Sequence, residues 1–148
     1  MRVSDVMHVD LVTCEPDLPV VAAVQRMAER RVGCVLVVDG RGRLAGVLSE
    51  RDVLRLVAER ADLERPPVST VMTTTVRTAP PDAELAWVAH EMAERSIRHL
   101  PIVEDGRAIG IISMRDLLEL SSKVLRHQGD AAARELLEAV DVGAPDRV

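Results

Sequence analysis

The sequence contains no phenylalanine, no tyrosine and a single tryptophan, Trp87. This shortage argues against the nucleic-acid-binding modules that stack bases on aromatic side chains. It also means that any core must be built from aliphatic side chains, and 47% hydrophobic residues supply enough of them for a folded protein. At 148 residues the chain is long enough for one compact domain or two small, interdependent ones.

Charge and hydropathy exclude further classes of protein. The net charge is −5, and arginines are interleaved with aspartates and glutamates, so nothing attracts the chain generally to phosphate backbones. No apolar run approaches the length of a membrane span, and no secretory signal opens the sequence. We therefore expect a soluble, cytoplasmic protein that binds neither nucleic acid nor a membrane.

Few residues point to catalysis or to metal binding. The two cysteines, Cys14 and Cys34, are expected to be reduced and buried, with a disulfide as the alternative. The four histidines are scattered without metal-ligand spacing, Ser49 and Ser113 have no obvious base beside them, and no glycine-rich phosphate loop precedes a helix. The sequence thus predicts neither an enzyme nor a metal or cofactor site.

What the chain does contain is an internal repeat. Residues 3–7, VSDVM, return as residues 68–72, VSTVM, at a shift of 65 (68 − 3). Residues 46–52 return as residues 110–116 at a shift of 64 (110 − 46), because one residue is lost in the intervening turn. Two copies of this length predict two similar units around a pseudo-two-fold axis, with clefts where the units meet.

Each unit is expected to follow the order β-α-β-β-α. In the first unit, a short strand ends near Thr13, apolar residues recur at helical spacing from Val20 to Met27, and strands over 35–38 and 44–48 precede a helix from Ser49. A helical crossover makes the first two strands parallel, and a tight turn makes the next pair antiparallel. The sequence therefore predicts an α/β (α+β) fold in which the two small sheets pack against each other.

The repeat also sets the expected organisation of the chain. We assign repeat 1 to residues 1–60, a linker to 61–67, repeat 2 to 68–122 and a helical C-terminal tail to 123–148. Within the tail, residues 121–126 can prolong the last helix, and apolar positions between Ala133 and Val140 predict a further short helix. The apolar stripe of this helix packs on its own domain or contributes to self-association.

The duplicated unit, closed each time by apolar-Gly-apolar-apolar-Ser-x-x-Asp, resembles a tandem pair of CBS (cystathionine β-synthase) domains over residues 1–122. The resemblance implies a stand-alone regulatory module that senses an adenine nucleotide (AMP, ADP or ATP) in its inter-repeat clefts. It also implies a homodimer that signals ligand occupancy to an unknown regulated protein. Two alternatives stay open: an interaction protein with empty clefts, and a sensor of an S-adenosyl compound or a dinucleotide.

The Ser-x-x-Asp motif has both a local and a functional interpretation. Ser49 and Asp52 lie three residues apart at a strand-to-helix junction, where a helix N-cap and a first-turn acid are common. A carboxylate there can also accept hydrogen bonds from ribose hydroxyls, while a hydroxyl and helix N–H groups favour a phosphate. The resemblance implies ribose binding by Asp52 and Asp116, with Ser49 and Ser113 near the phosphate and Arg51 and Arg115 beside them.

The repeats differ most before their second long strand, where repeat 2 has Arg98-His99 and repeat 1 has Gly33-Cys34. Basic residues at this place often reach phosphates in the family, so we expect Arg98 and His99 to bind phosphate and the two clefts to be unequal. The alternative is a surface arginine and a hydrogen-bonded histidine. The base is expected between aliphatic side chains and exposed backbone; the further candidate residues are Thr13, Val32, Gly33, Thr78, Ile97 and Pro101.

Overall fold

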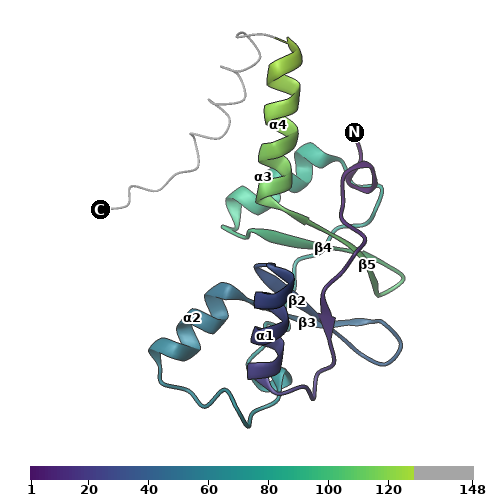
Figure 1. Cartoon of the computed structure of the whole chain (residues 1–148). Coiled ribbons are helices and arrows are strands. Elements are labelled where there is room, and N and C mark those ends of the chain that lie inside the picture. The colour runs from purple at the N-terminus through teal and green to yellow at the C-terminus, as the bar shows by residue number, and fades with distance from the viewer. Residues whose placement is uncertain (129–148) are drawn as a thin grey trace.

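The computed structural model describes residues 1–128, which form two similar halves stacked on each other (Figure 1). The first half contains β1 (Thr13–Cys14), α1 (Val20–Arg30), β2 (Cys34–Val38), β3 (Leu44–Ser49) and α2 (Glu50–Ala58). The second half contains α3 (Leu85–Glu94), β4 (His99–Glu104), β5 (Arg107–Ser113) and α4 (Met114–Gln128). A short 3₁₀ helix precedes each half: η1 (Val3–Asp5) and η2 (Val68–Thr70). The predicted mixed α/β fold is confirmed.

The first sheet has the strand directions that the sequence predicted. Its order is β1-β2-β3, with β1 parallel to β2 because helix α1 forms the crossover between them. Strands β2 and β3 are antiparallel and are joined by a short turn. The Ser-x-x-Asp motif therefore stands where β3 ends and α2 begins.

The second sheet lacks a regular first strand, and this differs from the expected β-α-β-β-α order. Only the antiparallel pair β4-β5 is regular, and the first strand is reduced to one parallel bridge between Ala79 and Ile102. The cause is Pro101, which occupies the position of Leu36 in the first half. The Leu36 N–H donates to the Val12 carbonyl at 3.0 Å, and proline has no N–H to make this bond.

The sheets lie in the middle of the molecule, and the helices of each half lie outside them (Figure 1). Alternating side chains of β2, Val35 and Val37, join an aliphatic core under α1 and α2, and Leu100 and Ile102 of β4 join the matching core of the second half. Leu36, on the opposite face of β2, is also buried. Both faces of the sheet are thus covered, as back-to-back packing requires.

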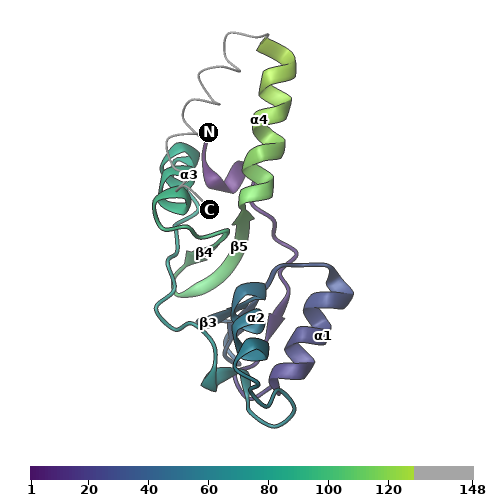
Figure 2. The same cartoon turned by 90° about the vertical axis from the view of Figure 1, so that its left-hand side faces the viewer.

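The two halves exchange their leading segments. Val3 is fully buried in the core of the second half, although it belongs to the first repeat, and Val68 is fully buried in the core of the first half. Figure 2 shows the N-terminus beside α3 accordingly. Each core is therefore completed by residues of the other repeat, so neither half has a whole core of its own.

The exchanged segments then pair with the returning strand of the half they complete. Thr73 and Val47 exchange two backbone hydrogen bonds at 2.9 and 3.0 Å, and His8 and Ile111 exchange two at 2.9 Å. These two pairs are equivalent in the repeat. As a result, Thr73 and His8 each line one of two clefts between the halves.

The structure tests part of what the sequence predicted for the C-terminal tail. Helix α4 runs to Gln128, so it includes residues 121–126, which were expected to prolong the last helix. The expected helix between Ala133 and Val140 lies outside the described residues. Within residues 1–128, no helix combines the length and the apolar character needed to cross a membrane. Cys14 and Cys34 are both buried and free, as predicted.

Candidate functional site

Two clefts lie between the halves, and each contains one of the two motif carboxylates. The cleft around Asp52, which we call the Asp52 cleft, has a volume of about 480 Å³, and the Asp116 cleft has a volume of about 640 Å³. Both volumes fall in the range of about 300–1,000 Å³ typical of small-molecule sites. Each cleft is lined by residues of both repeats, so a ligand in either one contacts both halves.

In the Asp52 cleft, the local interpretation of the motif is correct. The Ser49 N–H and hydroxyl both donate to Oδ2 of Asp52, at 2.9 and 2.7 Å, and the Asp52 N–H points at the Ser49 hydroxyl at 3.4 Å, so the pair forms a capping box at the start of α2. Among residues 1–128, the other oxygen, Oδ1, has one charged partner, the Arg55 guanidinium at 3.8 Å. One carboxylate oxygen is therefore left as an acceptor within the cleft.

The Asp116 carboxylate has the same cap but a different second partner. The Ser113 N–H and hydroxyl donate to Oδ2, both at 2.7 Å, while Oδ1 lies 2.8 Å from Nε2 of His8. Burial tends to raise the pKa of Asp116, but the hydrogen bonds from Ser113 and His8 outweigh it, and the pKa is lowered. The carboxylate is thus ionised, and Nε2 of His8 must carry the hydrogen that it accepts.

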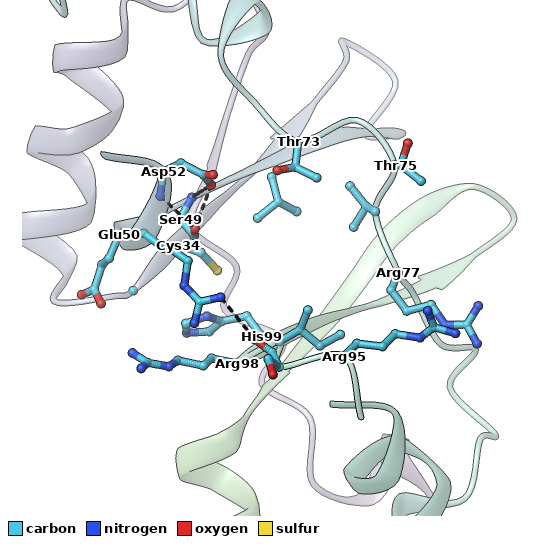
Figure 3. A pocket seen from close by; sticks show the side chains of 16 residues that line it. Cys34, Ser49, Glu50, Asp52, Thr73, Thr75, Arg77, Arg95, Arg98 and His99 are labelled. Carbon is cyan, nitrogen blue, oxygen red and sulfur yellow. Dashed lines mark hydrogen bonds between the residues drawn. The ribbon is translucent and has the colours of Figure 1, made fainter. Parts of the chain in front are cut away.

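Arg98 and His99 lie on a wall shared by the two clefts (Figure 3). Burial lowers the pKa of His99 and the Arg98 guanidinium adds to this effect, whereas Glu50 and Asp116 act to raise it. The Arg98 side chain is exposed, and among residues 1–128 its guanidinium makes no hydrogen bond or ion pair. This wall offers one permanent positive charge, on Arg98, and one imidazole whose lowered pKa favours the neutral form.

Gly33 makes room for this wall. A Cβ atom at Gly33 would lie 2.8 Å from Cε1 of His99, so the imidazole occupies the space that a side chain would fill. The neighbouring Cys34 also contacts both clefts, but burial, with a smaller contribution from Glu50, raises the pKa of its thiol to about 12. The thiol therefore stays protonated and is not poised as a nucleophile.

Each cleft also has an apolar pair at equivalent positions of the repeat. Val76 and Ile97 line the Asp52 cleft, and Leu11 and Val32 line the Asp116 cleft. All four side chains are partly buried. Such pairs can hold a flat heterocycle without an aromatic partner, which fits a chain that has so few aromatic residues.

The structure brings most of the predicted site residues to the clefts. Those lining the Asp52 cleft are Gly33, Ser49, Arg51, Asp52, Ile97, Arg98 and His99, and those lining the Asp116 cleft are Val32, Gly33, Arg98, His99, Ser113, Arg115 and Asp116. Thr13, Thr78 and Pro101 line neither cleft. Thr13 is paired within β1, and Pro101 is buried in β4 opposite Ile111.

Two arginines of the Asp52 cleft escaped the sequence analysis. Arg77 and Arg95 lie across the cleft from Asp52 (Figure 3), and both donate to Oε2 of Glu91, at 2.8 and 2.9 Å. The hydrogen bonds from Arg95 and Arg77 lower the pKa of Glu91. Glu91 thus holds both guanidinium groups at the rim. Arg95 and Glu91 form an i,i+4 pair, whereas Arg77 precedes Glu91 by 14 residues and lies outside helix α3.

Arg51 also reaches across the Asp52 cleft. Its Nη1 donates to the Ser96 carbonyl at 3.4 Å, which links the first turn of α2 to the other half. Among residues 1–128, no group of three or more histidine, cysteine or acidic side chains is arranged to hold a metal ion. The described clefts are thus built from carboxylates, cations and aliphatic side chains.

The molecule is thus a tandem repeat with a capped carboxylate in each of two clefts between its halves. The CBS domain family model matches residues 3–59 and 68–123, and the chain belongs to the CBS domain family.

Three known proteins illustrate the relationship. CBS domain-containing protein YhcV of Bacillus subtilis is 35% identical over 116 residues, which cover 78% of this chain and 81% of that protein. The crystal structure of CBS-domain containing protein ATU1752 from Agrobacterium tumefaciens is similar at 30% identity with a TM-score of 0.73, covering 80% of this chain and 91% of that one. CBS domain protein PAE2072 from Pyrobaculum aerophilum, solved in complex with AMP, is 28% identical with a TM-score of 0.73, covering 82% and 99%.

Proposed function

We propose that this protein is a regulatory module that binds an adenine nucleotide in its inter-repeat clefts and conveys occupancy to a partner protein. One observation carries the proposal: each motif carboxylate stands in a cleft whose opposite wall comes from the other repeat. The complex of the related PAE2072 with AMP supports the choice of ligand. S-adenosyl compounds and dinucleotides share the adenosine part and are the alternative ligands.

The Asp52 cleft supplies a partner for each part of AMP. Oδ1 of Asp52 can accept from the ribose hydroxyls, because its other oxygen is the one committed to the cap. Val76 and Ile97 can enclose the base. The phosphate is expected to lie against Arg98 and the start of α2, where a guanidinium and helix N–H groups attract an anion.

Signalling in this proposal follows from the shared clefts. A nucleotide that contacts both halves binds best when the halves have one particular spacing, and its binding energy favours that arrangement. A partner protein that recognises the same arrangement then responds to the nucleotide. The role is regulatory rather than catalytic, in keeping with a buried, protonated Cys34 thiol.

Titration calorimetry of AMP and adenosine against wild type and Arg98→Ala tests the proposal. We expect Arg98→Ala to weaken AMP binding by about ten- to hundredfold, because a charge-assisted hydrogen bond is lost, and to change adenosine binding little. Glu104→Ala, on the exposed end of β4 and outside both clefts, is the matched control and should bind AMP as wild type does. Equal losses for AMP and adenosine would contradict the assigned role of Arg98, and no binding of any adenosine compound would favour an interaction protein with empty clefts.

A further inference from the structure

The two clefts differ at one position that the repeat makes directly comparable. His8 and Thr73 are equivalent residues, and each exchanges a pair of backbone hydrogen bonds with the returning strand of the half it completes. The backbones therefore place both side chains alike. Only their chemistry differs, since threonine ends in a short hydroxyl and histidine extends a ring with a hydrogen-bond donor at its far end.

This difference decides what the carboxylates have left to offer. Both oxygens of Asp116 are engaged, Oδ2 by Ser113 and Oδ1 by Nε2 of His8 at 2.8 Å. Thr73 lines the Asp52 cleft but makes no side-chain hydrogen bond to Asp52. Within the described part of the chain, the partner of Oδ1 of Asp52 is Arg55, at 3.8 Å. The oxygen proposed to bind a ribose diol accepts no side-chain hydrogen bond from residues 1–128 in one cleft, and it accepts one from an imidazole in the other.

The His8 contact is of a kind that a ligand can displace. The His8 side chain is 64% exposed, whereas the Asp116 side chain is 14% exposed, close to the 18% of Asp52. The imidazole is therefore an exposed partner of a carboxylate that the fold itself largely buries. The backbone bonds of residue 8 do not depend on its side chain. Rotation of the imidazole would uncover the carboxylate at the cost of one charge-assisted hydrogen bond.

We propose that the His8 imidazole competes with a ribose diol for the Asp116 carboxylate, so that nucleotide fills the Asp52 cleft first. This inference rests on the proposed function and adds an order of filling to it. A nucleotide in the Asp116 cleft must replace the His8 hydrogen bond, whereas in the Asp52 cleft it meets an oxygen whose nearest cation, Arg55, lies 3.8 Å away. We expect the Asp116 cleft to bind AMP about ten- to hundredfold more weakly for this reason.

The test isolates each cleft with an asparagine at the other carboxylate and uses AMP in titration calorimetry. In the Asp52→Asn background, which leaves the Asp116 cleft, adding His8→Thr should strengthen AMP binding by at least about tenfold. In the Asp116→Asn background, the mirror change Thr73→His should weaken AMP binding by a similar factor. Threonine at this position is already accommodated in the other half, and circular dichroism with melting temperatures checks that each variant is folded.

The outcomes separate this inference from the proposed function. If the Asp116→Asn protein binds AMP but His8→Thr changes nothing in the Asp52→Asn background, the proposed competition by His8 is wrong, while the proposal of nucleotide binding is supported. Loss of AMP affinity on His8→Thr would also contradict the proposed competition, because His8 would then be a ligand contact. If neither single asparagine variant nor the wild type binds AMP, both the proposed function and the proposed competition by His8 are wrong.

Discussion

His99 is the residue whose charge state matters most to the proposed site. It lies between the clefts, faces Glu50, Asp116 and Arg98, and has a lowered pKa because burial disfavours the imidazolium. A phosphate dianion placed against the ring favours the protonated form, so AMP binding should draw a proton onto His99. Affinity gained in this way is fully present below the lowered pKa of the free protein and is lost as the pH rises through the pKa of the complex.

A pH series of AMP titrations on wild type and His99→Gln tests this linkage. The phosphate of AMP also titrates in this range, but it does so equally with both proteins, so the ratio of the two affinities isolates the imidazole. We expect the advantage of wild type over His99→Gln to shrink about fivefold between pH 5 and pH 8. A constant ratio would mean that His99 binds as a neutral ring or does not touch the phosphate.

The sequence was informative about residues wherever the repeat made a pattern visible. Asp52, Asp116 and their serines could be predicted because the same four-residue motif, Ser-x-x-Asp, occurs twice. Arg77 could not, because Glu91, which orients it, belongs to a different element and gives no signal at a fixed spacing. The hydrogen bond between His8 and Asp116 could not be predicted either, because it joins residues that are 108 positions apart in the sequence.

Among the elements, the two returning strands depend on a glycine where an exchanged segment crosses them. A Cβ at Gly46 would lie 2.5 Å from Sδ of Met72 and 2.8 Å from the Thr73 carbonyl oxygen. The same atom at Gly110 would meet the Met7 side chain and, at 3.3 Å, the His8 carbonyl oxygen. A methionine side chain can adjust, but a backbone carbonyl held by a strand pairing cannot move easily.

Alanine substitutions should therefore destabilise the protein in a defined order. We expect Gly46→Ala to lower the free energy of unfolding by about 1–3 kcal/mol, and Gly110→Ala to cost less, because its backbone contact is looser. Gly40→Ala is the control, since a Cβ there would meet nothing within 4 Å, and it should stay within about 0.5 kcal/mol of wild type. Urea unfolding measures all three, and equal effects at positions 40 and 46 would rule out the crowded crossing.

Element order followed from hydrophobic periodicity, but the exchange of leading segments did not. The strands and helices of both halves appear near their predicted positions because their apolar spacing is regular. The loss of the first strand in the second half traces to a single missing N–H at Pro101, an effect that only becomes visible once Leu36 is seen to donate at the same place. The absence of this strand was thus determined by its hydrogen-bonding partner in β4 rather than by the β-propensity of its own residues.

At the scale of the whole molecule, two exposed leucines occupy equivalent positions on the outer helices of the two halves. Leu54 on α2 is 70% exposed and Leu118 on α4 is 53% exposed, and the two positions are equivalent in the repeat. We propose that these helices form the interface of a homodimer, because matched apolar positions on both halves suit a symmetric contact. The double variant Leu54→Glu/Leu118→Glu should then be a monomer by light scattering. Val9→Glu, at a position that is exposed but lies outside the helices, should leave the dimer intact; a monomeric wild type would refute the interface.

The central claim is that the folded protein binds an adenine nucleotide between its halves, and the melting temperature with and without AMP tests it most directly. At about a hundred times its dissociation constant, AMP should add about 2.7 kcal/mol to the free energy of unfolding and raise the melting temperature by about 5 to 10 °C. The double variant Asp52→Asn/Asp116→Asn should lose most of this rise. An unchanged melting temperature of the wild type in millimolar AMP, ADP and ATP, with no heat in calorimetry, would contradict the account.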